Sequence, residues 1–121
     1  MQRFFNTRFL GSISSFILFM VLLSPVSAFT IADYKRITST SKSEQQIMEM
    51  YVIGTGQGIF WSSAYNKANG NSRIFCTPPK MPFTGDVILS VFNKAVKENR
   101  FKPTDDLELA LIYELIRVFP C

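Results

Sequence analysis

The stretch from Ser43 to Asn71, SEQQIMEMYVIGTGQGIFWSSAYNKANGN, decides the fold that we expect for this chain. Ser43 is a suitable N-cap for a helix, and Asn69-Gly70-Asn71 is a suitable stop. Between them, residues recur at alternating steps of four and three, as they do along one stripe of a helix: Ile47, Tyr51, Gly54, Gly58, Trp61, Tyr65 and Ala68. We therefore expect one long helix with this stripe buried.

Three glycines inside that helix need an explanation, because each costs about 1 kcal/mol relative to alanine. Gly54 and Gly58 lie on the expected stripe, where they would leave a flat groove for a neighbouring helix or for a seam between two copies of the chain. Gly56 lies off the stripe and has no such reason. The segment from Gly54 to Gly58 also looks like a phosphate loop, but no Lys-Ser/Thr pair follows it, so helix packing is the better interpretation.

Two further helices are expected towards the C-terminus. Residues 74–79 carry two prolines and should be extended. Thr84 can cap a second helix with an apolar face made of Val87, Ile88, Val91, Phe92, Ala95 and Val96. Thr104 can cap a third, in which Leu107, Leu111, Leu115 and Val118 follow at helical spacing, with Ala110, Ile112 and Ile116 widening the face.

The N-terminus has the layout of a secretory signal peptide. Arg3 and Arg8 precede an apolar stretch of residues 9–23, and small residues follow it up to Ala28. An uncleaved anchor is the alternative, but the stretch is shorter than the roughly 20 residues that span a bilayer. We expect cleavage of residues 1–28 before Phe29, a flexible arm over residues 29–43 because residues 38–43 are almost all Ser and Thr, and a helical domain over residues 44–121.

The chain has two cysteines, Cys76 and Cys121. In an exported domain, an even pair at the edges of a compact segment predicts a disulfide, whereas two free thiols are plausible only if the chain is not exported. The expected fold is thus all-α: a small domain of three main helices closed by one disulfide, after a cleaved signal peptide. A short additional helix in the arm stays open.

Composition argues against catalysis, metals and nucleic acid. The chain has no histidine, which removes Ser-His-Asp and Cys-His nucleophile arrangements and the usual imidazole metal site. Without the two signal-peptide arginines, eleven basic residues face nine acidic ones, a net charge of +2 with no basic run, so nucleic acid is an unsuitable partner. We expect no enzymatic activity, no cofactor and, after cleavage, no membrane association.

The chain carries three motifs: Tyr51-x-x-Gly54-x-x-x-Gly58-x-x-Trp61, Phe75-Cys76-x-Pro78 and a closing Phe119-Pro120-Cys121. Together these motifs resemble the resistance-associated (Rap/Tai-type) immunity proteins, over roughly residues 43–121. The resemblance implies a periplasmic helical protein, often dimeric, that inhibits a type VI secreted peptidoglycan amidase by occupying its cleft. Many members carry a further cysteine pair before the Tyr-x-x-Gly motif, and this chain lacks it. A small periplasmic stress chaperone is the alternative function.

An inhibitor needs exposed groups at a rigid surface, and two segments near the cysteines could supply them. These are the polar turn with Asn69, Asn71 and Arg73, and the proline-rich segment with Pro79 and Lys80. Anchoring by a disulfide limits the entropy that such loops lose on binding. The alternative, that the turn only connects two helices, stays open.

Overall fold

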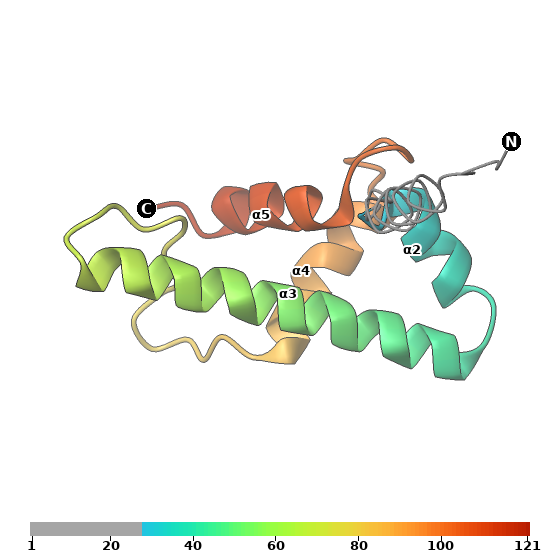
Figure 1. Cartoon of the computed structure of the whole chain (residues 1–121), viewed down its shortest axis with the longest axis horizontal. Helices are drawn as coiled ribbons and strands as arrows, with labels where there is room; N and C mark the ends of the chain where they lie inside the picture. The colour runs from blue at the N-terminus through green and yellow to red at the C-terminus, as the bar shows by residue number, and fades with distance from the viewer. Residues whose placement is uncertain (1–27) are drawn as a thin grey trace, which may run out of the picture.

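The computed structural model describes residues 28–121 and is built from helices (Figure 1). The four helices of this part of the chain are α2 (Ile31–Thr38), α3 (Lys42–Ala68), α4 (Gly85–Lys97) and α5 (Leu107–Val118). In Figure 1, α3 runs the length of the molecule, α5 lies along it, and α4 crosses behind both; α3 contacts each of the other three helices. The all-α prediction is confirmed, while the predicted signal peptide lies almost wholly outside the described residues.

The long helix α3 ends as predicted and begins two residues earlier. The hydroxyl of Ser41, not Ser43, accepts a hydrogen bond from the backbone N–H of Glu44. At the other end, Asn69 is the C-cap and Gly70 follows with a φ of 77°, a left-handed conformation that glycine adopts without strain.

The prediction of which α3 face is buried is wrong. The residues that α3 buries are Met48, Val52, Gly56 and Ser63. Gly56, which had no explanation in the sequence, faces the fully buried Ile88 of α4 so closely that a Cβ would lie 2.6 Å from Ile88 Cγ2. The glycine is therefore there to let α4 approach, which is the role that we had expected of Gly54 and Gly58.

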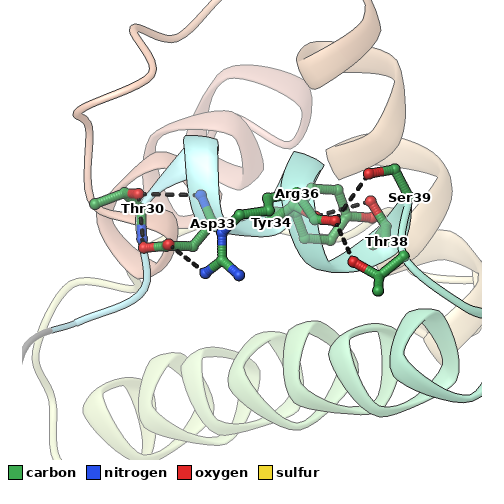
Figure 2. A network of polar contacts seen from close by, with 7 residues as sticks. Thr30, Asp33, Tyr34, Arg36, Thr38 and Ser39 are labelled. Carbon is green, nitrogen blue, oxygen red and sulfur yellow. Dashed lines mark hydrogen bonds and ion pairs between the residues drawn. The ribbon is translucent and has the colours of Figure 1, made fainter.

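The expected flexible arm over residues 29–43 is also wrong, because most of it is α2, a helix docked on the core. Ile31 and Tyr34 are 1% and 5% exposed. Thr30 and Asp33 form a reciprocal capping box at the start of the helix, shown in Figure 2: the Thr30 hydroxyl accepts from the Asp33 N–H, and the Asp33 carboxylate accepts from the Thr30 N–H. The polar run that follows caps the other end of the same helix, with the Ser39 hydroxyl donating to the Arg36 carbonyl.

The two C-terminal helices agree with prediction in their buried faces. Thr84 caps α4 by accepting a hydrogen bond from the N–H of Val87. Helix α5 begins at Leu107 after the N-cap Asp106, later than the predicted cap Thr104, because residues 102–105 form a turn in which the Asp105 carboxylate accepts from the Lys102 N–H. The predicted core positions of the two helices that are buried are Ile88, Phe92, Ala95, Val96, Leu107, Ala110, Leu111 and Leu115.

One side of α5 differs from expectation. Ile116, placed on the apolar face by its spacing, is 39% exposed, and Glu114 is 3% exposed instead. The Glu114 carboxylate pairs with Arg117 on the same helix and with Arg100 from the turn after α4, with 3.5 Å between Arg100 Nη1 and Glu114 Oε1. Two guanidinium groups thus compensate the burial of this carboxylate.

The predicted disulfide joins Cys76 and Cys121, whose Cα atoms lie 4.9 Å apart. It ties the segment after α3 to the segment after α5, and Figure 1 places the C-terminus beside the loop that leaves α3. Among residues 28–121, no helix has both the length and the apolar character that a membrane span needs.

Candidate partner-binding surface

The segment between α3 and α4 is irregular, and one buried hydroxyl group bonds three of its backbone groups. Ser63 on α3 is 3% exposed. Its hydroxyl donates to the carbonyl of Phe75 and accepts from the backbone N–H groups of Ile74 and Phe75. The next N–H, that of Cys76, donates to the carbonyl of Phe119 at 2.9 Å. The backbone N–H groups of three successive residues, 74–76, therefore have hydrogen-bond partners although the segment has no regular secondary structure.

Aromatic rings fix the same segment from the other side. The Phe75 ring is 2% exposed and packs against Phe60, Phe83 and Phe119, with ring centroids 5.3 to 6.4 Å apart. Phe60 and Phe83 are stacked at 5.0 Å. The loop is thus held by hydrogen bonds, by an aromatic cluster and by the disulfide, so the groups that it exposes have defined positions.

The structure brings three of the five predicted partner-binding residues together. Arg73 and Pro79 line one hollow of about 270 Å³, with Phe60 and Phe75 at its apolar wall. Arg73 also lines a second hollow of about 430 Å³ together with Asn71, Lys67 and the disulfide. Asn69 and Lys80 are exposed but line neither hollow.

The charge and shape of this end of the molecule suit a partner with acidic groups. Lys67 and Arg73 line the hollow beside the disulfide, and no Asp or Glu residue lines either hollow. Arg73 is exposed, so its guanidinium can donate several hydrogen bonds to a carboxylate or to backbone carbonyls of a partner.

The stripe expected in the core is instead an exposed row along α3. Ile47, Trp61 and Tyr65 are 65%, 66% and 70% exposed, and Tyr51 also lies at the surface. A Cβ at Gly54 or Gly58 would meet nothing within 4 Å. This row, Ile47, Tyr51, Gly54, Gly58, Trp61 and Tyr65, is called the α3 row below. The prediction that Gly54 and Gly58 form a packing groove within the chain is wrong. The alternative, that they form a seam between two copies of the chain, stays a prediction.

Further exposed apolar residues lie on α5 and had no counterpart in the sequence prediction. Leu109 and Tyr113 are 46% and 60% exposed. With Phe101, Asp105 and Asp106 they line a hollow of about 300 Å³ at the start of the helix. The sequence did contain a signal for them: α5 carries apolar residues on most of its sides, and a helix of a small domain cannot bury all its sides.

The part of the chain that the structure describes holds no cluster of three or more His, Cys, Asp or Glu side chains that could bind a metal ion. Two exposed features stand out in it, the anchored loop that carries Arg73 and the α3 row. No protein-family model, curated protein or solved structure matches this chain.

Proposed function

We propose that this chain is an exported immunity protein, which binds a type VI secreted peptidoglycan amidase in the periplasm and inhibits it by covering its active site. The proposal takes the toxin class from the motif resemblance and the binding surface from the geometry. The observation that carries it is the position of Arg73, exposed between two hollows on a loop fixed by Ser63, the Phe75 cluster and the disulfide.

A rigid, exposed loop suits inhibition by occlusion. Association costs free energy for every side chain and loop that becomes ordered, and a loop that is already fixed avoids much of that cost. Arg73 offers donors to polar groups in the cleft, and Pro79 beside it offers a stiff apolar surface.

Elsewhere on the surface, α3 exposes two residues of the type that dominates interface energies. Trp61 and Tyr65 are spaced one helical turn apart and are both more than half exposed. Tryptophan, tyrosine and arginine are the residues most often found at binding hot spots. We propose that Arg73, Trp61 and Tyr65 are the main contacts with the amidase.

Binding and inhibition test the proposal with purified proteins. The amidase effectors encoded in the same genome are titrated one by one with this protein, and peptidoglycan hydrolysis is followed. We expect one effector to be inhibited at a 1:1 ratio of chains, and Arg73→Glu and Trp61→Ala each to weaken binding by about 10-fold or more. Tyr113→Ala, a similarly exposed aromatic residue on α5, is the matched control and should bind as the wild type does.

A cellular test addresses export. A strain without this gene should be killed by a sister strain that delivers the toxin, and the gene should rescue it only with residues 1–28 present. Survival of the deletion strain, together with no binding to any encoded amidase, would remove the proposal.

The α3 row is the observation that favours the alternative, a periplasmic stress chaperone, since chaperones bind unfolded chains through exposed apolar surface. An aggregation assay with the purified protein distinguishes the two functions. A chaperone suppresses the aggregation of unrelated denatured proteins, whereas an immunity protein acts on one toxin. A dimer through the α3 row is compatible with either function; if it forms, Gly58→Leu should stay folded and elute as a monomer in size-exclusion chromatography.

A further inference from the structure

One carboxylate oxygen in the first turn of α5 has no hydrogen-bond partner among the residues that the structure describes. The Tyr51 hydroxyl donates a hydrogen bond to Glu108 Oε1, which raises the pKa of the Tyr51 phenol. The other oxygen, Glu108 Oε2, is buried, and no hydrogen-bond donor among residues 28–121 reaches it. Buried polar atoms without a partner are rare in folded proteins, so this one points to a missing donor.

Phe29 contacts two neighbours of Glu108: the preceding residue in the chain, and the tyrosine that bonds its carboxylate. Its carbonyl accepts a hydrogen bond of 2.8 Å from the N–H of Leu107, the residue before Glu108. Its ring packs edge-on against the ring of Tyr51, with 5.1 Å between the centroids. The backbone of Phe29 is thereby held beside the first turn of α5.

We propose that the α-ammonium group of Phe29, created when the leader is removed, binds Glu108 Oε2 and so couples cleavage to the stability of the fold. The proposal rests on the export part of the proposed function. A signal peptidase hydrolyses the bond between Ala28 and Phe29: the C–N bond breaks, water is consumed, Ala28 keeps a carboxylate and Phe29 gains an ammonium group. Cleavage thus supplies a cation with three donors to the unpartnered oxygen.

The other nearby carboxylate, Asp33, already has its partners. Asp33 Oδ2 accepts from the N–H and the hydroxyl of Thr30, and Asp33 Oδ1 pairs with Arg36 at 2.9 Å (Figure 2). Asp106 is exposed to solvent. Glu108 is therefore the acceptor that gains most from a new cation.

The test is a thermodynamic cycle on the mature chain, residues 29–121, which contains every core residue that the structure describes. The chain is released from a fusion protein so that it begins at Phe29, and half of it is acetylated at the α-amine, which removes the charge. Unfolding by urea is measured for both forms in the wild type, in Glu108→Gln and in the control Asp106→Asn. We expect acetylation to lower the folding equilibrium constant by about 3- to 10-fold in the wild type and the control, and to have no effect in Glu108→Gln.

A second readout does not depend on stability. The pKa of the Phe29 α-amine, followed by NMR on ¹⁵N-labelled Phe29, should lie above the usual 7.7 to 8.0 in the wild type and return to it in Glu108→Gln. An equal acetylation effect in wild type and Glu108→Gln, or an unshifted amine pKa, would overturn the pairing. N-terminal sequencing of the exported protein is the third measurement. A mature chain that begins at another residue would also overturn the pairing of Phe29 with Glu108, but it would leave the proposed toxin inhibition standing.

Discussion

Replacing Gly56 with alanine should destabilise the fold, whereas the same replacement at Gly54 or Gly58 should stabilise it. All three glycines lie inside α3, so alanine gains about 1 kcal/mol of helix propensity at each position. At Gly54 and Gly58 the new methyl group would meet nothing within 4 Å, and that gain remains in full. The three positions therefore separate helix propensity from packing within one helix.

At Gly56 the methyl group has no room. It would lie 2.6, 2.9 and 3.1 Å from three carbon atoms of Ile88, whose β-branched side chain is 0% exposed and cannot swing aside. Overpacking of this kind costs about 1 to 3 kcal/mol, and contacts this short place the cost at the upper end. Subtracting the helix gain leaves a net destabilisation of about 2 kcal/mol.

Thermal unfolding of the oxidised protein measures the difference. For a domain of this size, Gly56→Ala should lower Tm by about 10 °C, and Gly54→Ala and Gly58→Ala should each raise it by about 4 to 8 °C. Ile88→Ala should cost less in the Gly56→Ala background than in the wild type, because it removes the three carbons that clash. If Gly56→Ala is as stable as Gly54→Ala, the assignment of the buried α3 face is refuted.

Three further perturbations test other parts of the fold. Replacing both Cys76 and Cys121 with alanine should cost about 4 kcal/mol of unfolding free energy by urea titration, as for a loop of 45 residues, and an unchanged midpoint would contradict a stabilising disulfide. Burial raises the pKa of Tyr34 from 10.0 to about 12, so the neutral phenol stabilises the fold below pH 10, and this contribution is lost between pH 10 and 12. The unfolding free energy of Tyr34→Phe should lack this decrease between pH 10 and 12. If the unfolding free energies of wild type and Tyr34→Phe change with pH in parallel, the phenol does not contribute. Glu114→Ala should cost about 1 to 3 kcal/mol in the same urea assay, because Glu114 is buried and doubly paired, while Glu98→Ala at the surface should change stability little; equal effects would argue against the Glu114 network.

The elements that local patterns determine were predictable from the sequence. The cap at Thr84, the apolar face of α4 and the Leu107, Leu111 and Leu115 repeat of α5 each depend on residues within one or two turns. The disulfide was predictable too, because it needed only the cysteine count and the export prediction.

The orientation of α3 was not predictable in this way. A helix of 27 residues, about 40 Å long, carries apolar residues on two faces, and helical spacing fits both. The deciding contact is between Gly56 and Ile88, which are far apart in the sequence, and no local pattern contains it. Large aromatic residues such as Trp61 pointed to the wrong face because their size usually indicates burial.

The docking of helix α2 on the core was not predicted, although the sequence contains the signal for the helix. Thr30 and Asp33 have the spacing of a capping box, and Ile31 and Tyr34 follow at the spacing of a short buried face. The Ser- and Thr-rich run up to Ser43 outweighed that signal. At the candidate surface, the exposure of Arg73 and Pro79 could be predicted, but the hollow that joins them depends on the tertiary anchoring of the loop.

The hydrogen bonds to the Ser63 hydroxyl should make the amide hydrogens of an irregular loop exchange with solvent as slowly as those of a buried helix. The amide hydrogens of Ile74 and Phe75 are bonded to it, and that of Cys76 is bonded to the Phe119 carbonyl, so they exchange with solvent deuterium only when α3 or the C-terminal segment separates from the loop. These three amides should therefore exchange about as slowly as those in the buried helices, and the loop would open together with the whole domain.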